Sequence, residues 1–571
     1  MLKRLLAVLA APFLLGACAT LPVEAAPAPP DNGAERGMVS AADPRAAEAG
    51  VAMLRQGGNA TDAAMATMLA LTVVEPESSG IGGGGFLVLD PGNGRTTTYD
   101  GRETAPASAT PDRFLADGRP MRFAEAQPGG KSTGVPGNVA LMAKAHGEHG
   151  KLPWNALFQP AIRLARDGFA VTPRLHDVLA KAKRTGALSA EARALYYGAD
   201  GEPVPAGTVV HNPALAAFLE KMAEQGPEAF YAGENANAIA TAVQTAPRNP
   251  ADMTRADIAA YVAVERDPAC GTYRAYLICG MGPPSSGATT VFAILKQLEA
   301  FDMAAYGPED PVAWHLIAES MRLAFADRAR WLGDPGFAQV PTAGLMDGGY
   351  LLGRGNQIRI DSTIAHPEPG LPPGARAIMA EHVGVPEQGT SHFVAVDGQG
   401  GIASYTSTIE SAFGSGLMVH GFYLNNELTD FSFVPEKDGS PVANRVQAGK
   451  RPRSSMSPTI VYNLDGSFRL AIGAAGGATI IAQVAKAIVG VIDWNLTAQD
   501  AIDLPVIFAP GDTVFVEAGT PLETMIPALQ ALGHADVRAS RGRFKGNAIE
   551  RVGGKLVGAA DIRSEGAVVA Q

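Results

Sequence analysis

The residues Gly389-Thr390-Ser391-His392 could carry nucleophilic chemistry at a threonine. A Thr hydroxyl is a poor nucleophile unless a base removes its proton. A chain break just before Thr390 would free an α-amine of ordinary pKa about 7.7–8.0, so that nucleophile and base would belong to one residue. The preceding glycine leaves room for the hydroxyl to attack its own upstream carbonyl in an N–O acyl shift. Because a Gly-Thr pair alone is usually structural, the rest of the chain must decide.

Strands and helices predicted around Thr390 must position it. Alternating apolar residues predict strands at 392–396, 402–407, 459–464 and 468–472, joined in pairs by hairpins across 397–401 and 465–466. Helical spacing predicts a helix from Asp43 to Gly57-Gly58, a buried one at 61–74, and others at 156–167, 212–224, 312–329, 478–492 and 521–532. Residues of about 140–330 form a predicted helical layer, and residues 367–373 an exposed linker. This order predicts stacked antiparallel sheets with helices on both faces.

The glycine-rich run from Gly80 to Gly85 leads into an apolar strand at 86–89. A loop that cradles phosphate needs a helix after its glycines, so a nucleotide-binding loop is rejected. The functional group of this run is predicted to be its backbone.

Composition limits the class of protein. The 571 residues carry a net charge of −11 and are 46% hydrophobic, which excludes a disordered chain and argues against nucleic acid as a partner. The length allows three or four domains or one continuous α/β body, and no internal repeat is visible.

The N-terminus predicts export. Lys3 and Arg4 precede an apolar run at 5–15 that is too short to span a bilayer. The following Leu15-Gly16-Ala17-Cys18 resembles a bacterial lipobox, so we expect a signal peptide at 1–17, a tether at 18–37, and a periplasmic protein held to the membrane only by lipid on Cys18. An ordinary signal peptide cut near Ala26 is the alternative.

Two further cysteines, Cys270 and Cys279, flank a segment that predicts two short strands meeting near Arg274. A disulfide and two buried thiols are both compatible with this spacing.

Short motifs spread from residue 39 to residue 567 closely resemble, in the same order, those of the gamma-glutamyltransferases. Upstream of the nucleophile they are Gly58-Asn59-Ala60-Thr61-Asp62-Ala63, Gly82-Gly83-Gly84-Gly85, Arg102-Glu103-Thr104-Ala105-Pro106, Gly134-Val135-Pro136-Gly137 and Pro283-Pro284-Ser285-Ser286-Gly287. From the nucleophile onward they are Gly389-Thr390-Ser391-His392-Phe393, Thr406-Ser407-Thr408-Ile409, Phe413-Gly414-Ser415-Gly416, Leu424-Asn425-Asn426-Glu427-Leu428-Thr429-Asp430-Phe431, Arg453-Ser454-Ser455-Met456-Ser457-Pro458-Thr459 and Gly476-Gly477.

The resemblance implies an α+β fold, the four-layer αββα sandwich of N-terminal nucleophile hydrolases. It implies a proenzyme that cuts itself between Gly389 and Thr390 into a large subunit (38–389) and a small one (390–571) that stay together. Thr390 would then cleave a γ-glutamyl amide such as glutathione and pass the acyl group to water or to an amino acid or peptide. Thr408 would orient Thr390, and the amides of Gly476 and Gly477 would form the oxyanion hole. No cofactor or metal is required.

A γ-glutamyl group carries an α-carboxylate and an α-ammonium, so its pocket needs both signs of charge. Arg102, with the hydroxyls of Ser454 and Ser455, suits the carboxylate, because Arg can hold it in a two-pronged fork. Glu427 and Asp430 suit the ammonium.

The chain departs from the family pattern at Glu410, where well-known members have Asn. A carboxylate there could accept from the α-ammonium or repel the α-carboxylate. A glutaryl or cephalosporin acylase with the same nucleophile is therefore an alternative, and a non-catalytic lipoprotein scaffold is another. Residues 432–453, where the family's lid loop would lie, contain no Tyr or Trp, which argues against an aromatic gate.

Histidines supply weaker candidates. His146 and His149 lack a third ligand at a recognisable spacing, which argues against zinc. His392 shares a strand face with Thr390 but is predicted to be a packed strand residue, since the Thr amine already supplies a base.

Overall fold

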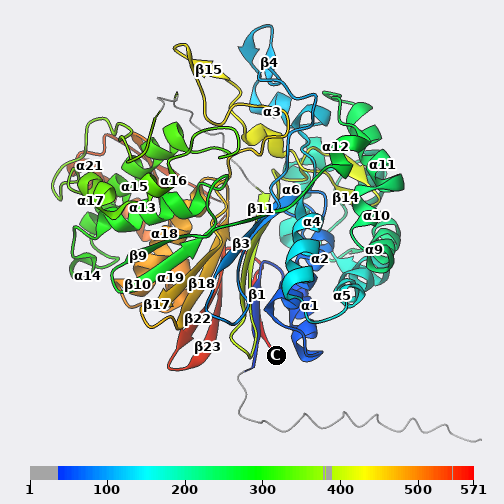
Figure 1. Ribbon diagram of the computed structural model, residues 1–571, viewed down its shortest axis with the longest axis horizontal. Coiled ribbons are helices and arrows are strands. Elements are labelled where there is room, and N and C mark those ends of the chain that lie inside the picture. Colours follow the sequence, from blue (N-terminus) through cyan, green and yellow to red (C-terminus); the bar gives the residue numbers. More distant parts are fainter. Residues whose placement is uncertain (1–35, 377–379, 381–388, 543) are drawn as a thin grey trace, which may run out of the picture. The chain divides into compact units, whose positions relative to one another are not determined.

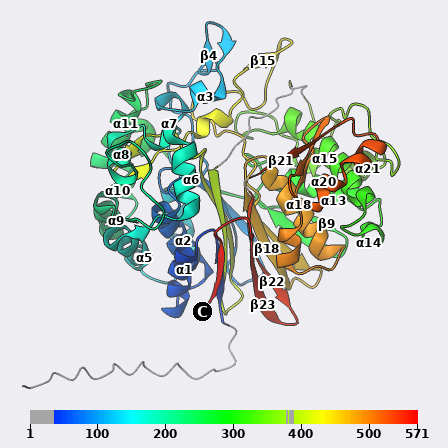
Figure 2. The ribbon, with the colours of Figure 1, turned by 180° about the vertical axis from the view of Figure 1, so that it is seen from behind.

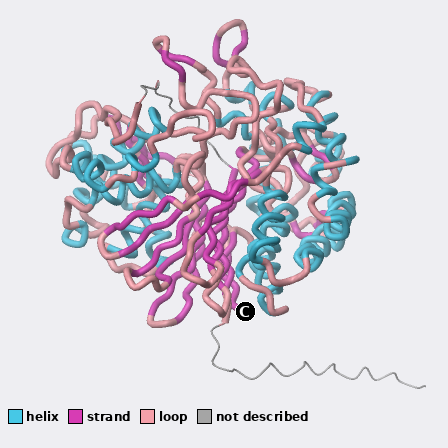
Figure 3. Tube along the Cα trace, in the orientation of Figure 1, coloured by secondary structure: helices cyan, strands magenta, loops and turns pink. Residues whose placement is uncertain are grey.

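Two antiparallel sheets form the centre of the computed structural model, which describes residues 36–376, 380, 389–542 and 544–571 (Figures 1 and 3). The first sheet has the order β24 (Ala567–Ala570), β1 (Met38–Ala41), β11 (Gly389–Val396), β12 (Ile402–Glu410), β2 (Gly84–Asp90), β3 (Thr97–Asp100) and β8 (Val264–Arg266). The second has the order β23 (Lys555–Ala560), β22 (Lys545–Val552), β18 (Phe468–Ala475), β17 (Thr459–Asn463), β10 (Tyr276–Gly280) and β9 (Ala269–Tyr273).

Helices cover the outer face of each sheet, as Figure 1 and the reverse view in Figure 2 show. Beside the first sheet lie α1 (Pro44–Arg55), α2 (Ala60–Val74), α4 (Asn138–His149), α5 (Trp154–Asp167), α9 (Pro213–Gln225) and α11 (Gly233–Gln244). Beside the second lie α13 (Gly287–Leu298), α15 (Pro311–Trp331), α17 (Gly348–Gly355), α18 (Thr479–Ile492) and α19 (Ala498–Asp503). The predicted four-layer αββα arrangement is confirmed.

Strand β11 is buried along its whole length because it has a core on each side. Its side chains alternate between them: Phe393 and Ala395 pack in the helix-side core with α2, whereas Val394 and Val396 pack in the core between the sheets. Helix α2 is buried at every residue, as its mostly apolar composition predicts, and Asn59 and Asp62 form its capping box.

Two expectations need correction. The helix predicted at 521–532 is two short helices, α20 (Pro521–Thr524) and α21 (Ile526–Ala531), because Pro527 has no N–H to continue the hydrogen-bond ladder. The helices expected to form one layer across about 140–330 divide between the two outer layers, since β8, β9 and β10 carry the chain from one to the other.

The two cysteines form a disulfide. Cys270 in β9 and Cys279 in β10 are register partners with Cα atoms 4.2 Å apart. The predicted hairpin places the two cysteines opposite each other, and of the disulfide and the two buried thiols that the sequence left open, the structure has the disulfide.

The predicted signal peptide, Cys18 and nearly all of the predicted tether lie outside the described residues. Among the helices that are described, none is long and apolar enough to cross a bilayer.

Candidate active site

Thr390 is the second residue of β11 and lies at an irregularity in the sheet. Gly389 pairs with Glu410 and Ser391 pairs with Ser407, so two residues of β12, Thr408 and Ile409, lie opposite Thr390 alone. Such a bulge re-aims the side chain beside it. Thr390 is only 4% exposed.

The Thr390 hydroxyl lies against the peptide bond that the sequence predicts to be cut. Its Oγ1 is 2.6 Å from the carbonyl oxygen of Gly389 and 3.3 Å from Thr408 Oγ1. Thr408 in turn donates to the same carbonyl oxygen at 2.6 Å and accepts a hydrogen bond from the Glu410 amide at 2.8 Å. The Thr390 hydroxyl and the Gly389 carbonyl are thus adjacent.

The glycine-rich run that leads into β2 allows this arrangement because Gly83 has no side chain. A Cβ on Gly83 would lie 1.9 Å from the carbonyl oxygen of Thr408. Any side chain here would push away the strand that carries Thr408, so glycine is required for close approach.

Gly476 and Gly477 follow β18 and precede α18, with φ angles of 125° and 62°. Neither amide donates a hydrogen bond to another described residue. Two unused N–H groups at the N-terminus of a helix are suited to an oxyanion.

Arg102, just after β3, joins the two acidic residues predicted to bind an ammonium. Its guanidinium donates to the carboxylates of Glu427 and Asp430 and, at 3.1 Å each, to the carbonyl oxygens of Pro452 and Arg453. Glu427 and Asp430 begin and end the 3₁₀ helix η2 (Glu427–Asp430). The chain therefore brings these three residues into one buried cluster.

A fourth charged residue, Glu103, belongs to this cluster, although only its motif was noted in the sequence. Its side chain is completely buried, neither carboxyl oxygen has a hydrogen-bond partner, and one lies 4.0 Å from Arg102 Nη1. Burial raises the pKa of Glu103 to about 8 despite Arg102. Burial likewise raises the pKa of Glu427 and of Asp430, with Arg102 opposing both shifts.

Ser454 and Ser455 lie in the loop before β17, and both hydroxyls are engaged. Ser454 Oγ accepts from the Met456 amide at 3.1 Å, and Ser455 Oγ accepts from Arg328 at 2.7 Å. Arg328, on α15, also donates to Ser286 Oγ at 2.8 Å. Arg328 was not predicted from the sequence, because α15 carries several charged residues and nothing in their spacing distinguishes this one.

Glu410 ends β12 with a φ of 76° and is buried. Its carboxylate accepts a hydrogen bond from the side-chain amide of Asn426, the residue before Glu427. Glu410 thus lies between Thr408 and the buried cluster around Arg102. Its amide donates to Thr408, and its charge raises the pKa of Glu427, though less than burial does.

The histidines take structural positions. His392 is buried, bonds Thr406 Oγ1 through Nδ1 at 2.9 Å, and packs against Gly473 of the opposite sheet. Burial lowers the pKa of His392 to about 3, so the predicted packed strand histidine is confirmed. His146 and His149 bond the Leu152 carbonyl and the Tyr99 hydroxyl, respectively. No metal-binding group of three or more ligands occurs among the described residues.

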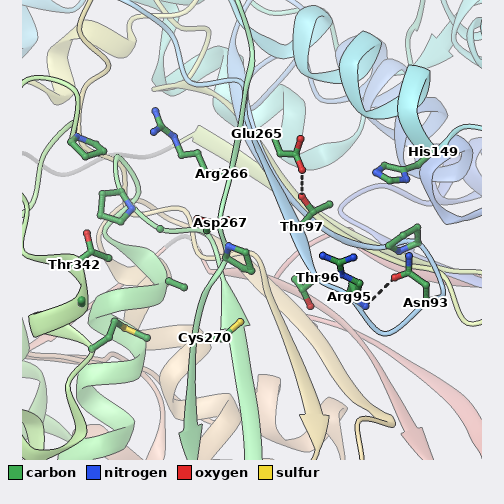
Figure 4. A pocket seen from close by; sticks show the side chains of 18 residues that line it. Asn93, Arg95, Thr96, Thr97, His149, Glu265, Arg266, Asp267, Cys270 and Thr342 are labelled. Atoms are coloured by element: carbon green, nitrogen blue, oxygen red, sulfur yellow. Dashed lines mark hydrogen bonds between the residues drawn. The ribbon is translucent and has the colours of Figure 1, made fainter.

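A cavity of about 1000 Å³ opens elsewhere, beside β8 and β9 (Figure 4). Its wall includes Arg95, Thr97, Glu265 and Arg266, with Glu265 accepting from Thr97 at 2.9 Å. The described residues that line this cavity include none of the predicted catalytic or substrate-binding residues.

Comparison with known proteins identifies the family. The profile of the gamma-glutamyltranspeptidase family matches residues 46–571. The chain belongs to this family. It is 39% identical over 482 residues to the glutathione hydrolase proenzyme of Escherichia coli (strain K12), covering 83% of this chain and 80% of that protein. The resemblance seen in the sequence motifs is confirmed.

Proteins named as acylases are also similar to this chain. It is 34% identical over 544 residues to the acylase ACY 1 proenzyme of Pseudomonas sp. (strain V22), covering 94% and 93% of the two chains. The crystal structure of cephalosporin acylase from Bacillus halodurans superposes with a TM-score of 0.82 at 28% identity, over 94% of this chain and 96% of that one. The N-terminal nucleophile hydrolase fold is therefore confirmed. The relatives of this chain include proteins named as glutathione hydrolases and proteins named as acylases.

Proposed function

We propose that this protein is a self-processing gamma-glutamyltransferase-like enzyme that cleaves γ-glutamyl amides such as glutathione. The acyl group would pass through an ester on Thr390 to water or to an amino acid or peptide. The observation that carries the proposal is the Thr390 hydroxyl, 2.6 Å from the Gly389 carbonyl oxygen, with Thr408 bound to that same oxygen.

Maturation would use this geometry directly. Thr390 Oγ1 attacks the Gly389 carbonyl carbon, the C–N bond breaks, and the nitrogen leaves as the α-amine of Thr390. Water then hydrolyses the new ester and leaves a carboxylate on Gly389. Thr408 supplies a hydrogen bond to the oxygen on which charge develops.

Turnover would reuse the same hydroxyl, with the freed α-amine as base. Oγ1 attacks the γ-carbonyl of the donor while the amides of Gly476 and Gly477 hold the oxyanion. The leaving amine takes the proton, and water or an acceptor amine then opens the acyl-enzyme.

Donor recognition would proceed by exchange of ion pairs. Arg102 forms ion pairs with Glu427 and Asp430. A γ-glutamyl donor can give its α-carboxylate to Arg102 and its α-ammonium to the two acids, so every buried charge keeps a partner. A glutaryl donor has no ammonium and would leave the acids unpaired, which is costly in a buried site. This difference favours the γ-glutamyl donor.

The first test is the denatured intact mass of the purified protein, with the N-terminus of each fragment determined. We expect two chains, the smaller spanning residues 390–571, and a single uncut chain for Thr390→Ala. An uncut, inactive wild-type chain would instead support the scaffold alternative.

The buried carboxylate of Glu410 favours a second candidate function, a glutaryl or cephalosporin acylase. This carboxylate, next to Glu427, adds negative charge where a donor α-carboxylate would bind. Matched γ-glutamyl and glutaryl anilides decide between the two: we expect kcat/KM to be higher for the γ-glutamyl donor, and equal or higher values for glutaryl would establish the acylase.

We also propose that the protein is exported to the periplasm and anchored by lipid at Cys18. The support is the apolar run at 5–15 and the lipobox-like residues that follow it. Labelling of cells with a fatty-acid probe should mark the wild type and not Cys18→Ser; equal labelling would exclude this anchor.

A further inference from the structure

A buried lysine, Lys545, touches the residue that follows the proposed nucleophile. It begins β22 of the second sheet, and its side chain is 1% exposed. Its Nζ lies 2.9 Å from both carboxylate oxygens of Glu75 at the C-terminus of α2, 3.3 Å from Ser78 Oγ and 3.4 Å from Ser391 Oγ. The ammonium therefore connects the second sheet to the first sheet and its helix layer.

Ser391 completes this cluster from the nucleophile strand. Its hydroxyl donates to Glu75 at 2.5 Å and accepts from Ser79 Oγ at 3.1 Å. Since Ser391 directly follows Thr390 in β11, the Glu75–Lys545 pair contacts the neighbour of the proposed nucleophile.

The segment 75–79 also holds the strand opposite Thr390. The carbonyl oxygen of Ser78 accepts from the amide of Ile409, which directly follows Thr408, at 3.2 Å. The carbonyl oxygen of Glu77 accepts from the Phe413 amide at 3.2 Å. One segment thus supports both threonines of the site.

The backbone of Lys545 is anchored at the other half of the site. Lys545 is the register partner of Ala475, the residue before Gly476. Gln483 reinforces the pairing, because its side chain accepts from the Lys545 amide at 3.3 Å and donates to the Ala475 carbonyl at 2.7 Å. Lys545 is therefore attached to the oxyanion-hole strand by its backbone and to the nucleophile strand by its side chain.

Charges of both signs face Lys545. Burial lowers the pKa of Lys545 and the Arg174 charge adds to that shift, whereas Glu75 and Glu77 oppose it. Burial raises the pKa of the neighbouring Glu77 to about 7, with the Glu75 charge adding to the shift. Because a buried ion pair often adds little net stability, we expect the Glu75–Lys545 pair to fix the positions of the residues around it more than to stabilise the fold.

We propose that Lys545, held by Glu75, is a positioning residue that fixes the Thr390 hydroxyl relative to the Gly476 and Gly477 amides. The inference rests on the proposed function, in which those groups perform the chemistry. A nucleophile and an oxyanion hole on different sheets need such a link, since a displacement of about 1 Å can cost about 100-fold in rate.

The test compares Lys545→Met, Glu75→Gln/Lys545→Met and a matched control, Lys486→Met, in the full-length protein. Lys486 is also a buried lysine, but its Nζ caps the carbonyl oxygens of Ala501, Ile502 and Leu504. We expect Lys545→Met to slow self-cleavage and lower kcat by about 30-fold or more, with KM changed less than about three-fold. Lys486→Met should lower Tm and leave kcat within about three-fold of wild type.

The double variant separates positioning from folding. Removing both charges should restore much of the Tm lost in Lys545→Met, but kcat should stay low because the link is still missing. A kcat in the double variant equal to that of Lys486→Met would overturn the proposal. If the lysine variants do not fold, Ser391→Ala, which deletes one oxygen, provides the test. We expect it to lower kcat by about three-fold or more, and an unchanged kcat would overturn the proposal.

Failure of the proposed function would look different. It would appear as an uncut or inactive wild type, or as cleavage that persists in Thr390→Ala. A wild type that cuts itself and turns over, together with normal Lys545 variants, would reject only the positioning role.

Discussion

The hydroxyl of Thr408 lies 2.6 Å from the Gly389 carbonyl oxygen and 3.3 Å from the hydroxyl of Thr390. One side chain therefore contacts both the group proposed to attack and the carbonyl that would be attacked. The Glu410 amide fixes its orientation by donating to Thr408 Oγ1 at 2.8 Å. We therefore propose a role for Thr408 in maturation as well as in turnover.

Thr408→Val keeps the shape of the side chain and removes its hydroxyl. We expect self-cleavage to slow about 100-fold or more, a loss typical of a missing oxyanion donor. Thr408→Ser retains the hydroxyl and serves as the control, with a rate within about ten-fold of wild type. The measurement is the appearance of the 390–571 fragment with time, and equal rates for Val and Ser would exclude the role.

Glu410→Asn should raise kcat/KM for γ-glutamyl donors by about five-fold, equivalent to about 1 kcal/mol. The reason is removal of a buried negative charge beside the proposed site of the donor α-carboxylate. The backbone is compatible, since Asn tolerates the φ of 76° at this position better than Glu does. Kinetics with one γ-glutamyl anilide would check this, and an unchanged or lower value would show that Glu410 serves another purpose.

Arg102→Lys should raise KM about ten-fold for donors with a free α-carboxylate, because Lys cannot form the two-pronged contact. Donors whose α-carboxylate is amidated should change much less. Arg102→Ala is a poorer test: it strips the buried Glu427 and Asp430 of their cation and should cost about 3–5 kcal/mol of folding free energy. Equal effects of Arg102→Lys on both kinds of donor would remove Arg102 from carboxylate recognition.

Glu103→Gln should change how stability depends on pH. Burial raises the pKa of Glu103 from 4.5 in the unfolded chain to about 8 in the folded one, so only the folded state keeps the proton between these values. The free energy of unfolding therefore falls as pH rises through this window. Gln cannot ionise, so the Tm of Glu103→Gln relative to wild type should increase from pH 5 to pH 8.5.

The control for this titration is Glu224→Gln, an exposed change on α9. Its Tm should stay parallel to that of wild type over the same pH range. A parallel curve for Glu103→Gln as well would show that Glu103 is ionised in the folded protein across the whole window.

The sequence by itself determined the family, the layer order and the nucleophile candidate. These are local properties: an apolar α2, alternating residues in β11 and β12, and a Gly-Thr pair at a strand start depend on neighbours along the chain. Their order, matched to the family motifs, was enough to predict an αββα sandwich. Helical spacing gave a wrong prediction at 521–532, where Pro527 lacks an N–H and the predicted helix is divided in two.

Only the tertiary structure decided which charges meet. Arg102 and Glu427 are 325 residues apart, and Lys545 and Glu75 are 470 apart, so no spacing in the sequence could pair them. Each contact joins segments that only the fold brings together: the segment after β3 with η2, and the start of β22 with the end of α2. Whether a buried Glu keeps its proton, as Glu103 does at neutral pH, depends on its desolvated three-dimensional neighbourhood and not on residue type. The same holds for whether a buried Lys links two sheets, as Lys545 does.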